Sequence, residues 1–151
     1  MIQYHYYPGT VEFDLLDAAG VVYHANYLTL CDRARQKSIE DLGFSFNDLW
    51  QTGNALVVYE TNSKYHTPLR WTDDYVVLTE LKKVSGVRIV VHQKILRLKD
   101  KSWLNKRSFL TTKIEPLDEV FYELEMTLVC IKRDSLKPSR IPEGLVKALT
   151  F

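Results

Sequence analysis

Asp17 is the residue in this chain whose position best suits acid–base or nucleophilic chemistry. It opens the run Asp17-Ala18-Ala19-Gly20, a turn of small residues that precedes a predicted long helix. The unpaired N–H groups of a first helical turn attract negative charge. A carbonyl group held there would meet a carboxylate, which could attack the carbonyl carbon or activate water as a base. From the pattern alone, an aspartate at such a position is more often a helix cap or a turn residue.

His24 could be a second acid or base, or could orient a substrate, although a histidine in a first helical turn more often packs or lies at the surface. The four histidines, His5, His24, His66 and His92, lack the short spacing of metal ligands, so no metal site is expected. No G-x-S-x-G motif, Cys–His pair or glycine-rich phosphate loop is present. The sequence therefore supports neither a serine or cysteine nucleophile nor a bound cofactor.

Basic residues surround a predicted hairpin turn at Ser85-Gly86. Lys82, Lys83 and Arg88 flank this turn and could hold the phosphate groups of a nucleotide tail. A solvated hairpin tip is the alternative, and the residues alone favour it.

The composition is that of one soluble domain. The chain has 151 residues, and its 20 basic and 19 acidic side chains leave a net charge of +1, which favours neither nucleic acid nor membrane as a partner. Cys31 and Cys130 fall in apolar patterns, which favours buried, reduced thiols. Residues 1–8 lack the pattern of a signal peptide and no apolar stretch is long enough to span a membrane, so a cytoplasmic location is expected. The aromatic residues expected to pack in a sheet are Tyr4, Tyr6, Tyr7, Trp71 and Tyr75.

A long helix is predicted to position this chemistry. It should begin between Tyr23 and Asn26 and end near Leu42, with Gly43 as the stop and Ser45 as the cap of a short second helix. Most charged side chains, Arg35 among them, are expected off its buried face. That face is a narrow stripe with spacings of three or four: Tyr27, Leu30, Cys31, Ala34, Ser38 or Ile39, and Leu42.

Most of the remaining chain reads as strands. In the last of them, apolar residues alternate with glutamates, which is typical of a half-buried antiparallel strand. Residues 99–106, with an isolated Trp103, are expected to form an exposed connection or hairpin tip, and 143–148 a short helix. One helix inserted into a run of antiparallel strands predicts an α+β fold. The predicted strands cover residues 3–13, 55–65, 75–84, 87–98, 108–114 and 120–131.

The segment D-A-A-G-V-V-Y-H-A-N-Y-L at 17–28 resembles the hallmark of hotdog-fold thioesterases of the 4-hydroxybenzoyl-CoA thioesterase family. That hallmark is Asp, two small residues, Gly, two aliphatic residues, an aromatic residue, a variable pair, Asn or Ser, and Tyr. C-D-R-A-R at 31–35, Y-H-T-P at 65–68 and K-P-S-R-I-P at 137–142 are similar to further segments of the family. The resemblance covers most of the chain.

This resemblance implies a single hotdog thioesterase domain over 1–151, a curved antiparallel sheet wrapped around one long helix. It also implies homodimers with sites at the subunit interface, often paired into homotetramers, that act on an acyl-CoA substrate. The residues carried over from the family are the catalytic Asp17; the backbone N–H groups of Tyr23 and His24 as oxyanion donors; His24, Tyr27, Val58, Tyr59 and Glu60 for the substrate; and Lys83, Ser85, Gly86 and Arg88 for the coenzyme A phosphates.

Within the family, the chain is most similar to cyanobacterial enzymes that hydrolyse 1,4-dihydroxy-2-naphthoyl-CoA on the way to phylloquinone, a relative of menaquinone. The alternatives are a thioesterase for short aliphatic acyl-CoA or acyl carrier protein substrates, and a non-catalytic acyl-CoA-binding module. Two features depart from the family. Leu15 and Leu16 replace polar residues before the acid, and the region 99–118 is longer than usual, either of which could alter acyl specificity or assembly.

Overall fold

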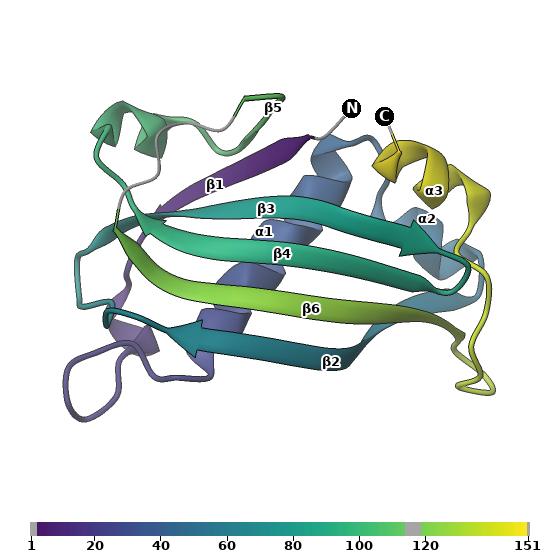
Figure 1. Cartoon of the computed structure of the whole chain (residues 1–151), viewed down its shortest axis with the longest axis horizontal. Coiled ribbons are helices and arrows are strands. Elements are labelled where there is room, and N and C mark those ends of the chain that lie inside the picture. The colour runs from purple at the N-terminus through teal and green to yellow at the C-terminus, as the bar shows by residue number, and fades with distance from the viewer. Residues whose placement is uncertain (1–2, 114–118, 151) are drawn as a thin grey trace.

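The protein is a six-stranded antiparallel sheet with one long helix lying across one of its faces (Figure 1). The computed structural model describes residues 3–113 and 119–150. The strand order is β2-β6-β4-β3-β1-β5, and the expected α+β architecture is confirmed. The strands are β1 Tyr4–Thr10, β2 Asn54–Tyr65, β3 Asp74–Ser85, β4 Arg88–Arg97, β5 Phe109–Thr111 and β6 Val120–Lys132. The helices are α1 Asn26–Asp41, α2 Phe46–Gln51 and α3 Glu143–Leu149, with 3-10 turns at Phe13–Leu15 and Lys101–Asn105.

Helix α1 packs through the predicted stripe, and one charged residue joins it. Leu30, Cys31 and Ala34 are at most 2% exposed, as the spacing predicted. Arg35 is also buried, at 7% exposure, although it was expected off this face. Arg35 donates hydrogen bonds to Asp32 and to Gln93 Oε1. Polar partners therefore compensate a charge that spacing alone placed in solvent.

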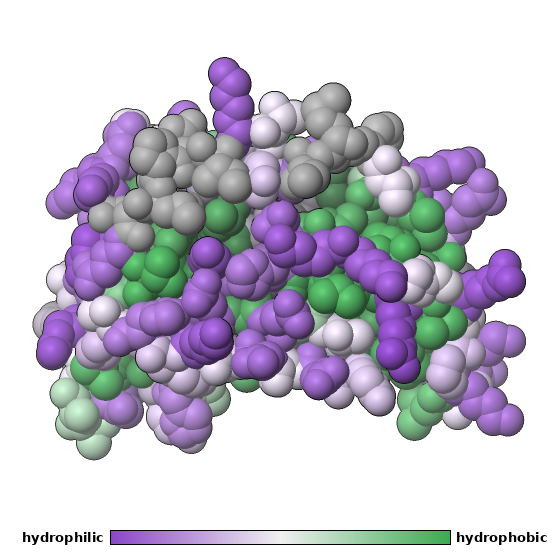
Figure 2. All heavy atoms as spheres, in the orientation of Figure 1, coloured by the Kyte–Doolittle hydropathy of each residue, from purple (hydrophilic) through white to green (hydrophobic). Residues whose placement is uncertain are grey.

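The sheet has a dry face toward α1 and a charged outer face. On β6, Tyr122, Leu124 and Leu128 point into the core beneath the helix, which confirms the predicted alternation. Figure 2 shows hydrophilic residues running across the centre of the opposite face. Phe121, the extra residue of a β-bulge opposite Ile95 and Leu96, also belongs to this core and is fully buried, with the Arg97 guanidinium 4.8 Å from its ring centre.

The segment after β4 is an exposed connection, as expected, except for Trp103. Trp103, in the Lys101–Asn105 turn, contacts Tyr6 and Phe109 with ring centres 5.4 and 5.1 Å apart. These rings lie over a second apolar cluster that includes Leu78 and Leu96. Trp103 is therefore partly buried by residues from distant strands, which the sequence did not predict. Of the longer region 99–118, residues 114–118 lie outside the described residues.

Local signals set several element ends where they were expected. Ser45 forms a capping box with Asp48 at the start of α2. The β3–β4 turn consists of Gly86 and Val87, and Gly86 has φ +59°, which residues with side chains rarely adopt. The first strand is shorter than predicted and ends at Thr10, and β5 keeps only three residues. In the described residues, no helix is long and apolar enough to cross a membrane.

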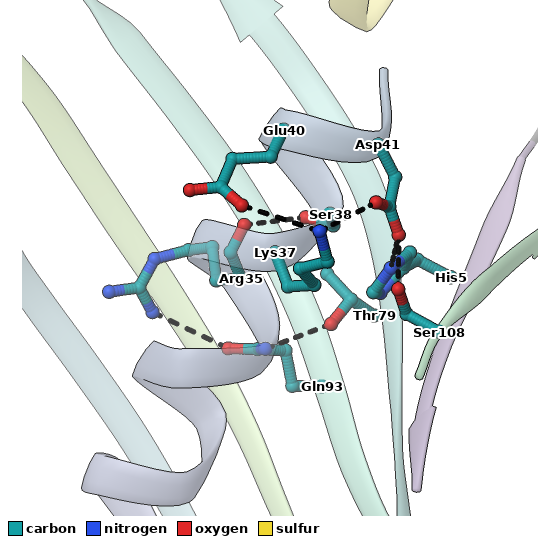
Figure 3. Close-up of polar contacts among 9 residues, drawn as sticks. All are labelled: His5, Arg35, Lys37, Ser38, Glu40, Asp41, Thr79, Gln93 and Ser108. Atoms are coloured by element: carbon teal, nitrogen blue, oxygen red, sulfur yellow. Dashed lines mark hydrogen bonds and ion pairs between the residues drawn. The ribbon is translucent and has the colours of Figure 1, made fainter. Parts of the chain in front are cut away.

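A buried polar cluster lies beneath the C-terminal half of α1 (Figure 3). His5 is 2% exposed, and its Nε2 lies 2.9 Å from Asp41 Oδ2. Asp41 also accepts hydrogen bonds from Ser108 and Lys37. Burial lowers the pKa of His5, and the charge of Lys37 adds to this effect, while Asp41 opposes it. The folded protein therefore holds His5 in its neutral form more firmly than the unfolded chain does.

We predict that the free energy of unfolding falls as the pH drops from about 7.5 to about 5.5. In that window the unfolded chain protonates His5 near its ordinary pKa of 6.5, while the folded protein does not, so protons favour the unfolded state. Urea denaturation at both pH values should show a smaller loss for His5→Gln than for the wild type. His92→Gln, on the outer face, is the matched control and should keep the wild-type slope. Equal pH dependence in all three proteins would contradict the prediction.

Candidate active site

Asp17 lies in a tight hairpin, residues 16–22, which we call the Asp17 hairpin. The N–H of Asp17 donates to the Val21 carbonyl at 2.8 Å, and its Oδ1 accepts from Ala19 N–H at 2.8 Å and from Val21 N–H at 3.4 Å. Gly20 closes the turn with φ +78°. In the part of the chain that the structure describes, Oδ2 has no hydrogen-bond partner. Backbone N–H groups thus fix one carboxylate oxygen, and the other is free to contact a bound molecule.

The hairpin is followed by the start of α1, although less directly than the sequence suggested. The helix begins at Asn26, nine positions after Asp17, and its cap residue Ala25 supplies no side-chain acceptor. Tyr23 N–H donates to the Leu15 carbonyl at 2.9 Å, so it is not free to act as the expected oxyanion donor. Among the described residues, the N–H of the exposed His24 has no acceptor. Of the two predicted donors, the structure therefore leaves His24 available.

Tyr27 anchors the site instead of lining it. It is 3% exposed, and its hydroxyl accepts the N–H of Leu69 at 3.0 Å. Burial raises the pKa of Tyr27, and Tyr65 and Asp17 raise it further, although the bond from Leu69 acts in the opposite direction. Val22 N–H donates to the Leu69 carbonyl at 2.8 Å, which ties the hairpin to the same residue. The expectation that Tyr27 contacts substrate is corrected here, because its side chain is buried and its hydroxyl is occupied.

A cluster of tyrosines supports the helix start from below. The rings of Tyr27, Tyr65 and Tyr122 lie with centres 4.9 to 5.3 Å apart. The Tyr65 hydroxyl donates to the His24 carbonyl at 2.9 Å, and the Ser63 and Tyr122 hydroxyls are 2.6 Å apart. The C-terminal end of β2 therefore holds the backbone of the oxyanion candidate in place.

Two exposed aromatic residues that the sequence reading did not assign to the site lie next to the hairpin. Phe13 and Trp71 are 69% and 57% exposed, with ring centres 5.4 Å apart. Trp71 was expected to pack in the sheet, and this was wrong. It follows Arg70, which forms a β-bridge with Val21 in the Asp17 hairpin. Phe13, an aromatic residue four positions before Asp17, was the available signal in the sequence.

The predicted β2 residues lie at an open edge of the sheet. Val58 and Tyr59 are 52% and 63% exposed. Tyr59 is the extra residue of a β-bulge between Val58 and Glu60. Its ring lies under the guanidinium of Arg88, 5.2 Å from the ring centre. The structure thus joins a residue predicted for the acyl group to one predicted for coenzyme A.

The β3–β4 hairpin lies at the other end of the sheet from Asp17 in the same chain. Lys83, Ser85, Gly86 and Arg88 are all exposed there. Asp74 begins β3 at the end nearest the Asp17 hairpin, and eleven further residues at about 3.3 Å each separate the two ends by roughly 35 Å.

Two further basic residues belong to the hairpin end of the sheet. Lys132 and Arg133 line a groove of about 590 Å³ there. Arg133 lies over the Trp50 ring at 3.5 Å and donates to the Trp50 carbonyl. The sequence reading left both unassigned, although two adjacent basic residues at the end of an apolar strand were a usable signal.

The two thiol groups lie in the core. Cys31 and Cys130 are free and buried, as expected. Burial raises the pKa of the Cys31 thiol to about 12, so it is a poor nucleophile. In residues 3–113 and 119–150, no group of three or more His, Cys, Asp or Glu side chains is placed to hold a metal ion.

The family follows from a comparison with known proteins. Residues 11–149 match the family model described as the thioesterase-like superfamily. The chain belongs to the thioesterase-like superfamily. Its sequence is 29% identical to an acyl-CoA thioester hydrolase, YbgC, of Escherichia coli O6:H1 over 140 residues, which covers 93% of this chain and 91% of that protein. The expected class of enzyme, a thioester hydrolase, is confirmed.

Solved structures confirm the hotdog fold of this superfamily member. A DHNA-CoA thioesterase from Staphylococcus aureus superposes with a TM-score of 0.78 at 26% identity, over 96% of this chain and 87% of that one. Slr0204 from Synechocystis, a 1,4-dihydroxy-2-naphthoyl-CoA thioesterase, gives a TM-score of 0.79 at 18% identity over 97% and 95% of the two chains. At that identity the second likeness shows the fold alone.

We predict that Tyr27→Phe destabilises the protein by about 1–3 kcal/mol, because it leaves the buried N–H of Leu69 without an acceptor. Tyr23→Phe removes the same atom from an exposed ring and should change stability by no more than about 0.5 kcal/mol. Urea denaturation of both variants measures the difference. A Tyr27→Phe protein as stable as Tyr23→Phe would show that the Tyr27 hydroxyl does not hold the loop.

Proposed function

We propose that this protein is an acyl-CoA thioesterase in which Asp17 acts as nucleophile or general base. The observation that carries the proposal is that the two carboxylate oxygens of Asp17 differ in their hydrogen bonding. Its Oδ1 is fixed by backbone N–H groups and its Oδ2 has no partner among the described residues. The unpaired N–H of His24 lies at the end of the same segment, where it can donate to the thioester oxygen. Such donors commonly contribute about 10²–10³ in rate.

Either role of Asp17 leads to the same products. As a nucleophile, Oδ2 bonds to the thioester carbon, the C–S bond breaks, and the thiolate leaves and takes up a proton. Water then cleaves the resulting anhydride and restores the carboxylate. As a base, Asp17 accepts a proton from water while the water oxygen bonds to the carbon; the C–S bond then breaks, and the thiolate leaves and takes up the proton from Asp17. In both routes His24 N–H faces the charge that develops on the carbonyl oxygen.

Assembly through β2 would complete the site. β2 is a twelve-residue edge strand with exposed apolar side chains, a surface that favours pairing with a second strand. If two copies pair antiparallel through β2, the C-terminal end of each strand lies beside the N-terminal end of the other. The hairpin with Lys83 and Arg88 in one copy then approaches Asp17 in the other, a distance that one chain does not span. Lys132 and Arg133 at the same end would add charge for the phosphates.

An aromatic acyl group fits the surface beside the Asp17 hairpin. Phe13 and Trp71 expose their rings there, and Tyr23 is 45% exposed with its ring 4.4 Å from that of His24. The names of the two structural neighbours also favour 1,4-dihydroxy-2-naphthoyl-CoA, an intermediate of phylloquinone and menaquinone synthesis. The proposal includes a cytoplasmic homodimer or homotetramer, with coenzyme A entering as part of the substrate and no separate cofactor.

Asp17→Asn should lower kcat by about 10²–10⁴-fold, because the amide retains an oxygen for Ala19 N–H but is neither nucleophile nor base. The measurement is thioester hydrolysis with 1,4-dihydroxy-2-naphthoyl-CoA, benzoyl-CoA, and aliphatic acyl-CoA and acyl carrier protein substrates. Asp14→Asn, an exposed neighbour, is the matched control and should keep full activity. Full activity of a folded Asp17→Asn enzyme would refute the role of Asp17. Selective turnover of aliphatic substrates would refute the aromatic group, and binding without turnover would refute catalysis.

Val58→Lys should weaken the dimer by at least about tenfold, because pairing through β2 would bring two like charges close together. Leu104→Lys, outside β2 in the turn that precedes β5, is the control and should leave the dimer intact. Sedimentation equilibrium measures both, and hydrolysis should fall with the dimer fraction. A wild-type monomer with full activity would rule out assembly through β2.

A further inference from the structure

A cavity of about 340 Å³ lies between the C-terminal half of α1 and the sheet. Aliphatic side chains form most of its wall, among them Ile39, Leu81, Val91, Leu128 and Leu149. It is distinct from the Asp17 site. The α1 residues that line it start at position 35, nine residues and about 13 Å along the helix from its first residue. A volume of this size falls at the lower end of the range of small-ligand sites.

The polar part of this cavity contains an acceptor that the protein does not use. His5 lines the cavity, is 2% exposed, and bonds through Nε2 to Asp41 (Figure 3). Asp41 also accepts from Ser108 and Lys37, and these bonds, together with that from His5, keep its pKa low although burial acts in the opposite direction. An ionised carboxylate only accepts hydrogen bonds, so Nε2 carries the proton of His5. The lone pair of the neutral ring is then on Nδ1.

His5 Nδ1 is buried and has no partner among the described residues, which is rare for a polar atom in a protein interior. Several polar groups near the cavity are paired with one another: Gln93 Nε2 donates to Thr79 Oγ1 at 2.9 Å and to the Cys31 carbonyl at 2.8 Å, and Gln93 Oε1 accepts from Arg35. Gln3 also lines the cavity, and its buried Oε1 is a second acceptor without a partner among the described residues. A bound molecule that carries a hydrogen-bond donor would satisfy Nδ1.

The charges around His5 select the kind of donor. Arg35 lines the same cavity, and Lys37 lies on the far side of Asp41, so an ammonium group would meet two cations. A carboxylate offers no proton to Nδ1. A neutral hydroxyl group satisfies the histidine, and an apolar body satisfies the aliphatic wall.

We propose that this cavity is a second binding site, which takes an apolar molecule or acyl tail whose hydroxyl group donates to His5 Nδ1. A neighbouring recess lies between the cavity and the edge of the sheet. This smaller recess of about 140 Å³ shares Arg35, Ile39 and Leu128 with the cavity and reaches Val58 on the edge strand β2. The site does not depend on the thioesterase reaction, and the binding measurement that tests it uses no thioester.

The test compares two isomers, 1-octanol and 1-methoxyheptane, which have the same atoms, but the ether has no hydroxyl proton. Calorimetric titration of the wild-type protein should show that octanol binds about 3- to 10-fold more tightly than the ether, the effect of one hydrogen bond. The ¹⁵N signal of His5 Nδ1 should shift with octanol alone. Equal binding of both isomers, or binding of neither, overturns the proposal without any variant.

A matched pair of variants on α3 locates the site. Leu149→Trp places an indole in the cavity and should abolish octanol binding, while Lys147→Trp, on the exposed side of the same helix, should retain it. Octanol binding that survives in Leu149→Trp overturns the assignment. Competition between octanol and an acyl-CoA substrate in the hydrolysis assay identifies the acyl tail as the natural occupant. Octanol binding without competition identifies a free hydroxylated molecule, and both results support the site.

Discussion

The shared carbonyl of Leu15 is the interaction on which the arrangement of the site depends. It accepts the N–H of Tyr23 at 2.9 Å and the side-chain amide of Asn26 at 3.0 Å. One atom thereby joins the residue before the hairpin to the residue after it and to the first residue of α1. Because Leu15 itself is 5% exposed, this junction is anchored in the core. Leu15, which departs from the family pattern, thus holds the Asp17 hairpin in position through its backbone carbonyl and its buried side chain.

The two halves of α1 serve different purposes. The N-terminal half is bound to the Asp17 hairpin and to the tyrosines beneath it, and its first N–H, that of Asn26, donates to the Tyr23 carbonyl at 2.8 Å. The C-terminal half carries Arg35 and Asp41, whose bonds to Gln93 and His5 create a polar interior next to an aliphatic cavity. A single amphipathic helix therefore organises two environments on one sheet.

The sequence predicted those features of the fold that depend on residues close together in the chain. The ends of α1, the capping box at Ser45 and the alternation in β6 all follow from neighbouring residues. The residues whose exposure was not predicted, Arg35, Trp71 and Trp103, are those whose surroundings depend on residues far along the chain. In the candidate site, the hallmark motif predicted the turn that carries Asp17 and the start of the helix. It did not show that a carbonyl outside the motif occupies the N–H of Tyr23, or that the Tyr27 hydroxyl bonds to Leu69, since spacing carries no information on tertiary hydrogen bonds.

The way in which the Asp17 hairpin is held has a consequence for how this enzyme can change. Its shape is set by main-chain bonds and by the one carboxylate oxygen, whereas the side chains of Ala18, Ala19, Tyr23 and His24 are exposed and take no part in closing it. Substitutions at these four positions can reshape the approach to the acid while leaving the acid in place. Evolution, or a library randomised at these positions, can therefore explore new acyl groups at little cost to the fold.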